Sequence, residues 1–258
     1  MLVHQISSWS QWKEMVPDLG GELPFGNGTD GHISSLLFRG HRCCSWKLES
    51  TLERKGIELP YLDSYAREIK AVKLAFESYL GSTWSSEFSP SELPAPPEDY
   101  EFMVYLRHHG YPTPLLDWTR SPYIAAFFAF QYPSEEESVA IFSFREYAGE
   151  PKTGWTGDSN IVGCGPTIRT HRRHYAQQAE YTYCRKKLDS GWVYSSHENA
   201  LEETGGSQDI LQKYILSSDI RCEALADLDL MNINAYTLFG SEEGLAEMLA
   251  NREYGYEA

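Results

Sequence analysis

Residues 107–130 read RHHGYPTPLLDWTRSPYIAAFFAF, and this stretch sets a polar, turn-rich segment directly against one of the most apolar segments of the chain. Ser121 followed by Pro122 is typical of a helix start, because the serine side chain accepts hydrogen bonds from free backbone N–H groups and proline already has a helical φ angle. We therefore expect a buried helix over 121–132. The residues before it, 113–119, are expected to form one rigid turn, braced by Asp117 and anchored by the apolar ring of Trp118. Such a turn either closes a pocket or only caps a core helix.

Outside this stretch, helical and strand patterns alternate irregularly. Apolar residues at three- and four-residue steps, such as Tyr65, Ile69 and Val72, predict a helix over 64–80 with Ser64 as its cap. By similar patterns we expect strands at 2–6, 33–40, 138–145, 180–184 and 211–217, helices starting near residue 8 or 10 and at 98–108, 218–231 and 241–251, and loops at 19–32, 81–98 and 149–168. This order favours one α+β domain over residues 1–258 rather than a regular parallel α/β fold.

The composition limits the functions to be considered. A formal net charge of −15 argues against sequence-independent binding to nucleic acid or to an anionic membrane, because such binding needs a basic face. The five cysteines form no CxxC pair and no HExxH spacing occurs, so we expect no metal site and a reducing compartment. The N-terminus lacks the pattern of a secretion signal, and no apolar run reaches roughly 18 residues. We therefore expect a cytoplasmic protein without a membrane span.

Arg39 is the first candidate for binding chemistry. It ends an apolar strand and is followed at once by Gly40. An arginine in this place can hold a phosphate through two parallel hydrogen bonds, while the glycine lets the ligand approach the backbone. The plain alternative is a strand-end arginine that pairs with a surface carboxylate.

Two further groups of polar residues are candidates for catalysis. His108 and His109 with Asp117 suggest an acid–base pair, although no third metal ligand is apparent. If residues 179–184 form a strand, Gln178 and Glu180 lie two residues apart and point to the same face. A glutamate and a glutamine so placed can bind a ribose hydroxyl and stabilise an oxocarbenium-like transition state. The alternative is the polar face of an edge strand.

Taken together, these segments resemble the FRG-domain family, a mostly bacterial family named for an (F/Y)RG motif. Phe38-Arg39-Gly40 stands in that place, Trp46-Lys47-Leu48 and Arg54 resemble the family's W.L.PSLxR motif, and residues 107–130 resemble QHxGxPTRLLDWTxxPxxALxFA. Further matches lie at Arg173, Gln177, Ala179, Tyr181 and Thr182 and in residues 231–249, so the motif-bearing core spans about 33–250. The chain departs from the pattern at three positions, where Arg107 replaces glutamine, Pro114 replaces arginine and Ala179 replaces glycine. Arg107 or Arg120 is a candidate to replace the missing arginine.

The order of these motifs is also loosely similar to that of ADP-ribosyltransferases. That resemblance implies a split sheet with flanking helices and NAD as the substrate. It assigns the phosphates to Arg39 and Gly40. It implies that a loop forms the nicotinamide pocket, with the residues Thr113, Asp117, Trp118, Thr119 and His108. It also implies that Glu180, helped by Gln178, stabilises the ribosyl cation.

The resulting expectation is an NAD-using enzyme that acts as a bacterial toxin or antiphage effector, with a nucleotide ligand and a macromolecular acceptor or defence-system protein as partners. A rival expectation is a non-catalytic module that senses a nucleotide or a protein with the same pocket. A third is a metal-dependent hydrolase or nuclease that uses His108, His109 and Asp117.

Overall fold

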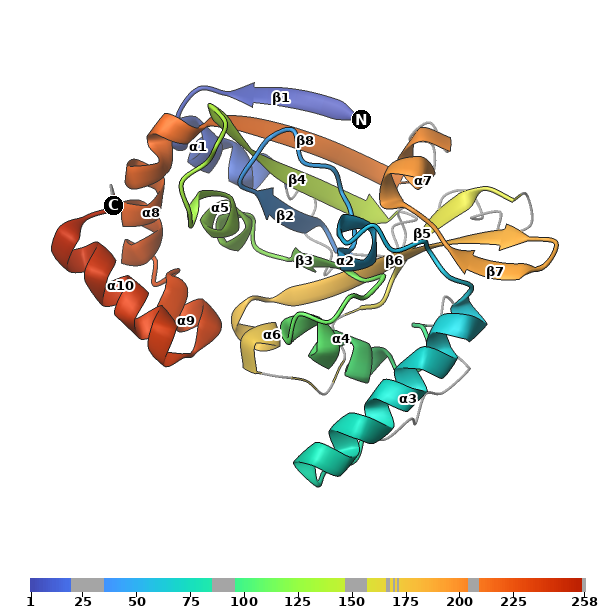
Figure 1. Ribbon diagram of the computed structural model, residues 1–258. Helices are drawn as coiled ribbons and strands as arrows, with labels where there is room; N and C mark the ends of the chain where they lie inside the picture. The colour runs from blue at the N-terminus through green and yellow to red at the C-terminus, as the bar shows by residue number, and fades with distance from the viewer. Residues whose placement is uncertain are drawn as a thin grey trace, which may run out of the picture.

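The computed structural model describes residues 1–19, 35–84, 96–146, 157–165, 168, 170, 172–203 and 209–256. Its strands are β1 (Leu2–Ile6), β2 (Leu37–His41), β3 (Leu116–Thr119), β4 (Ser138–Glu146), β5 (Ser159–Gly163), β6 (Ala179–Leu188), β7 (Gly191–Tyr194) and β8 (Asp209–Ser217). Its helices are α1 (Trp9–Leu19), α2 (Thr51–Arg54), α3 (Leu62–Leu80), α4 (Tyr100–His108), α5 (Pro122–Phe130), α6 (Arg172–Ala176), α7 (His197–Glu203), the 3-10 helix η1 (Ser218–Ile220), α8 (Arg221–Leu230), α9 (Ala235–Phe239) and α10 (Glu242–Tyr254). The expected α+β class is confirmed (Figure 1).

The eight strands form one mixed sheet in the order β1-β8-β4-β2-β3-β6-β5, with β7 paired to β6. Only β1 and β8 run parallel among the pairs formed by the described residues. The connection between the two halves of the sheet is narrow, because β2 and β3 share a single register position, Phe38 opposite Thr119. Figure 1 shows α8, α9 and α10 beside the β8–β4–β2 half and α3 and α4 beside the β6 half.

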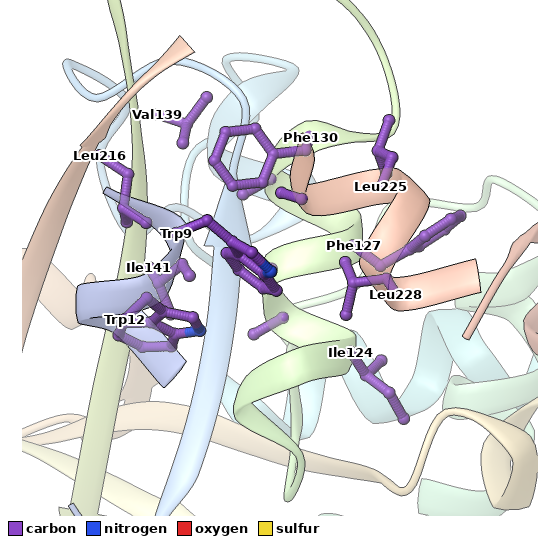
Figure 2. Packing of buried hydrophobic residues seen from close by; sticks show 14 of the residues in the cluster. Trp9, Trp12, Ile124, Phe127, Phe130, Val139, Ile141, Leu216, Leu225 and Leu228 are labelled. Carbon is purple, nitrogen blue, oxygen red and sulfur yellow. The ribbon is translucent and has the colours of Figure 1, made fainter. Parts of the chain in front are cut away.

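The apolar core on the α5 face is built around the helix that the opening stretch predicts. Ser121 caps α5 by accepting a hydrogen bond from the Ile124 N–H, and Pro122 is its first residue. A first cluster, defined by the buried residues that α5 shares with α1, α8 and the adjacent strands, includes Trp9, Trp12, Phe127, Phe130, Ile141 and Leu228 (Figure 2). Because α5 is apolar on nearly all sides, it is stable only when both the sheet and other helices cover it.

Two more clusters divide between the faces of the sheet. The second cluster packs α3 and α4 against Ala179, Tyr181 and Tyr183 of β6, and the third packs α7 against Leu116, Trp118 and the alternate residues of β4. Asp117 lies opposite Tyr181, and Thr119 lies opposite Phe38 of the first cluster. Side chains two apart on a strand share a face, so the first and second clusters lie on the same face and the third lies on the other.

Several expected boundaries were wrong. The expected turn at 113–119 contains a strand, β3, and the expected loop at 149–168 contains β5. β2 begins at Leu37 rather than at residue 33, and α3 begins at Leu62 after Tyr61, so Ser64 is not its cap. The expected loop at 19–32 lies outside the described residues except for residue 19, which ends α1, and the loop at 81–98 lies partly outside them. Among the described residues, α2, α6, α7, α9 and β7 were not expected at all.

Candidate functional site

A pocket of about 200 Å³ lies on the α5 face of the sheet, where the first and second clusters meet. It is lined by Phe38, Arg39, Gly40, His108, Asp117, Trp118, Thr119, Phe128, Gln177, Ala179 and Tyr181. Pockets that enclose a drug-sized ligand measure about 300–1,000 Å³. This one therefore fits a single ring or phosphate group, and a whole nucleotide would extend beyond its opening.

Arg39 is the cation of this pocket, and it is held by three hydrogen bonds. Its Nη1 donates to the Asp117 carboxylate at 2.5 Å and to the Asp117 backbone carbonyl at 2.6 Å, and its Nε donates to His41 Nε2 at 2.8 Å. The side chain keeps only 12% of its surface exposed. β2 and β3 pair at a single position, and beyond it the bonds from the Arg39 side chain to Asp117 connect the two strands. The Arg39 guanidinium is therefore fixed at the pocket wall.

Asp117 receives a second guanidinium, that of Arg107 from α4, whose Nη2 donates to the same carboxylate oxygen. The protein atoms around Asp117 disfavour its charged form, but the nearby positive charges of Arg107 and Arg39 outweigh this effect and hold the pKa of Asp117 well below its usual range. The carboxylate is therefore ionised at neutral pH, and its side chain still exposes 46% of its surface. The pair of arginines around one accessible carboxylate carries a local positive charge within an acidic protein.

His41 is neutral beside this group. Because an arginine N–H can only donate, His41 Nε2 must accept the bond from Arg39, which leaves the proton on Nδ1, near the Trp46 carbonyl at 3.4 Å. Burial and the charge of Arg39 lower the pKa of His41 to about 3. His41 therefore adds no charge and orients the Arg39 guanidinium.

His108 provides the polar group on the second-cluster side of the pocket. Its Nε2 lies 3.0 Å from the Tyr181 hydroxyl, and the buried His174 stacks on the Tyr181 ring at a centroid distance of 5.9 Å. Burial, together with the charge of Asp117, raises the pKa of Tyr181, so the phenol stays protonated. His108 and the protonated Tyr181 phenol thus form a hydrogen-bonded pair, suited to hydrogen bonding with an amide or a hydroxyl of a ligand.

Trp118 fixes β3 from the opposite face. Its ring stacks on Phe144 at 5.3 Å, and its Nε1 donates to the Thr182 hydroxyl, which also contacts His197 Nε2 at 2.9 Å. Burial, then the charges of Arg39 and Arg107, lower the pKa of His197 to about 3. The expected role of Trp118 as an apolar anchor agrees with this packing.

The structure explains why residue 40 is a glycine, for a reason that the sequence did not suggest. A Cβ atom at this position would lie 1.9 Å from the Ala125 carbonyl oxygen and 2.7 Å from the Ala129 amide nitrogen of α5. Helix α5 therefore occupies the space in which a ligand was expected to approach the backbone. Gly40 lines the pocket, but close packing of α5 on β2 is what requires a glycine there.

Three of the expected site residues, Gln178, Glu180 and the buried Thr113, do not line the pocket. Gln178 has a left-handed backbone with φ of 47° just before β6, so the alternation of the strand does not include it, and its side chain is exposed. Glu180 is buried and ion-paired with Arg120, and it lies on the opposite face from the pocket residues Ala179 and Tyr181. Burial raises the pKa of Glu180, and Arg120 partly offsets this. The expected common face of Gln178 and Glu180 was therefore wrong.

Thr113 and Thr119 hold the backbone. The Thr113 amide donates to the Thr51 hydroxyl at 2.8 Å, and the Thr119 hydroxyl donates to the Gln177 carbonyl at 2.7 Å. Arg107, in contrast, is a central residue that the sequence marked only as a departure from the family pattern and as a candidate to replace the missing arginine. The one available signal was its place at the C-terminal end of a helix, just before the LLDWT segment. Of the two arginines considered as replacements, Arg107 reaches Asp117, whereas Arg120 reaches Glu180.

Fold and pocket together define an α+β domain with a small pocket lined by Arg39 and Asp117, and the buried Arg107 pairs with Asp117 behind it. Residues 34–138 match the family model of the FRG domain, so the chain contains an FRG domain, as its motifs indicated. Neither the curated proteins nor the solved structures contain a match to this chain. In the described part of the chain, no helix is long and apolar enough to cross a membrane, and no three His, Cys, Asp or Glu side chains are grouped to hold a metal ion.

Proposed function

We propose that this FRG domain binds a phosphate-bearing nucleotide in the Asp117 pocket, and that the nucleotide is NAD. The observation that supports this most is the convergence of Arg39 and Arg107, with 12% and 9% side-chain exposure, on one carboxylate at the pocket wall. Two guanidinium groups beside one carboxylate retain one net positive charge. Guanidinium groups bind phosphate oxygens through paired, charge-assisted hydrogen bonds.

The reaction that we propose is ADP-ribosyl transfer. The bond between the ribose carbon and the nicotinamide nitrogen breaks, its electron pair leaves with nicotinamide, and an acceptor nucleophile bonds to the same carbon. Arg39 would hold the phosphates, His108 with Tyr181 would bind the nicotinamide amide, and the ionised Asp117 would face the positive charge that develops on the ribose. Preorganised electrostatic stabilisation of this kind is commonly worth ~3 kcal/mol per group.

In this proposal the stabilising carboxylate is Asp117 rather than Glu180, because Glu180 is buried, is ion-paired with Arg120 and does not line the pocket. The biological setting that we propose is the one suggested by the family resemblance, a bacterial toxin or antiphage effector with a macromolecular acceptor.

A second candidate function is a non-catalytic sensor that binds the same nucleotide. It is favoured by the state of Asp117, which both arginines already engage and which is therefore less able to stabilise a cation than a lone carboxylate. Binding of a nucleotide without cleavage is the behaviour expected of such a sensor.

The test is to titrate the protein with NAD by calorimetry and to follow nicotinamide release by chromatography, with and without cell lysate as a source of acceptors. Arg39→Gln removes the cation, and Arg252→Gln is the matched control, because Arg252 is half exposed and pairs with Asp229 on the C-terminal helices. Release that Arg39→Gln abolishes and Arg252→Gln preserves would support the enzyme. Binding without release would support the sensor, and the absence of NAD binding would overturn both.

A further inference from the structure

A third arginine, Arg54, lies next to the pair that holds Asp117. Arg54 ends α2, one helical turn after Thr51, and Ser50 fixes the start of α2 through a capping box with Glu53. Thr51 accepts a hydrogen bond from the Thr113 amide at 2.8 Å and contacts Arg107 Nη1 at 3.4 Å. Residues three apart on a helix lie side by side. Arg54 therefore lies on the same side of α2 as Thr51, which contacts Arg107.

Arg54 differs from its two neighbours because its side chain is not neutralised by contact. It is exposed, and within the described residues it forms neither a side-chain hydrogen bond nor an ion pair. Partial burial, and then the positive charges of Arg39 and Arg107, lower the pKa of Arg54, so two of its charged neighbours repel it. An unpaired guanidinium close to two others is unfavourable unless an anion joins them.

The local charges support an anionic ligand with more than one phosphate. Arg39, Arg54 and Arg107 contribute three positive charges, and the carboxylates that act on Arg54 are Asp117 and Glu49. His41 and His197 are neutral, since the pKa of each is lowered to about 3. The cluster therefore keeps a positive excess, and its exposed member is the one free to move onto a ligand.

We propose that Arg54 forms, with Arg39 and Arg107, a subsite for the second phosphate of a diphosphate group, so that the ligand is a dinucleotide or a nucleoside diphosphate rather than a monophosphate. This inference rests on the proposed nucleotide site and specifies which ligands that site accepts. Arg39 and Arg107 bind the phosphate nearer the pocket, and the Arg54 guanidinium closes over the next one. Arg54 is then a binding residue with no part in cleavage.

The experiment compares AMP with ADP, which differ by one phosphate, by calorimetry at fixed ionic strength. Arg54→Gln removes the guanidinium, and Lys55→Gln removes a neighbouring exposed charge as the matched control. We expect the wild type to bind ADP at least tenfold more tightly than AMP. Arg54→Gln should weaken ADP binding about tenfold, or ~1.4 kcal/mol, and leave AMP binding unchanged, whereas Lys55→Gln should change neither.

Two results would overturn the subsite while leaving the nucleotide site intact. The first is an equal loss of ADP affinity in Arg54→Gln and Lys55→Gln, which would indicate a general charge effect. The second is unchanged ADP binding by Arg54→Gln. Failure of the wild type to bind NAD, AMP or ADP would overturn the proposed function itself, and the subsite with it. Because Arg54 is exposed and is repelled by its two neighbours, its substitution should not lower the unfolding temperature, which a thermal melt of each variant would check.

Discussion

Asp117→Asn is the substitution that tests most directly how the pocket is held together. Asparagine keeps the shape of the side chain but removes the charge that Arg39 and Arg107 share. Arg39 Nη1 lies 2.5 Å from Asp117 Oδ1 and Arg107 Nη2 bonds the same oxygen at shorter range, so the two nitrogens lie no more than about 5 Å apart, which is twice 2.5 Å.

The expected loss of stability follows from this geometry. Two positive charges about 5 Å apart repel by roughly 3 kcal/mol at an effective dielectric constant near 20. Water screens part of this repulsion, because the Asp117 side chain exposes 46% of its surface. We therefore expect Asp117→Asn to lower the free energy of unfolding by about 2 kcal/mol, which lowers the melting temperature by roughly 4–8 °C in a chain of this size.

Urea unfolding at several pH values is the assay. The folded-state pKa of Asp117 lies well below its value in the unfolded chain, near 4. Its contribution is therefore present in full above about pH 4 and is lost as the pH falls through the folded-state pKa. The difference between wild type and Asp117→Asn should be constant from pH 8 to 5 and should shrink below about pH 4.

Asp229→Asn, which removes a pair with the half-exposed Arg252, is the control and should cost less than about 1 kcal/mol. Added pyrophosphate should stabilise Asp117→Asn more than the wild type, because the anion can replace the lost carboxylate between the arginines. An Asp117→Asn protein as stable as the wild type at pH 7, with no added response to pyrophosphate, would refute the assignment of Asp117 as the counter-ion of both arginines.

Three other measurements check the remaining assignments. Gly40→Ala should destabilise the fold by about 3 kcal/mol in urea unfolding, since its Cβ would lie 1.9 Å from the Ala125 carbonyl; a near-neutral effect would mean that α5 is not seated on β2. His41 and His197 are buried and neutral, and the pKa of each is lowered to about 3. The free energy of unfolding should therefore be at its full value above pH 6.5 and should fall below that pH by up to about 1.4 kcal/mol per pH unit for each histidine. His197→Gln should remove about half of this slope, and an unchanged slope would exclude His197 as a source. Glu180→Gln should leave NAD binding unchanged, because its side chain is paired with Arg120 and does not line the pocket, and a tenfold loss would show that it reaches the ligand.

What the sequence predicted well was local in origin. The α5 start at Ser121-Pro122 was predicted because the cap and the fixed φ of proline act within one helical turn, and Ser121 does accept the Ile124 N–H at 3.3 Å. The anchoring role of Trp118 was also predicted. The common face of Gln178 and Glu180 was not correct, because the period of two holds only inside a strand and Gln178 has a left-handed backbone outside it.

By itself, then, the sequence determined the α+β class, the FRG motifs and the segments rich in polar residues that surround the pocket. Tertiary structure alone decided how those residues are grouped. Arg39 and Asp117 are 78 positions apart and meet only because β2 and β3 become neighbours in the sheet and share one register pair. Arg107 joins them from α4, and Glu180 is turned to the other face by the pleat of β6. Such contacts depend on strand order and register, which local propensity does not encode, because they result from burying the apolar faces of the whole sheet at once.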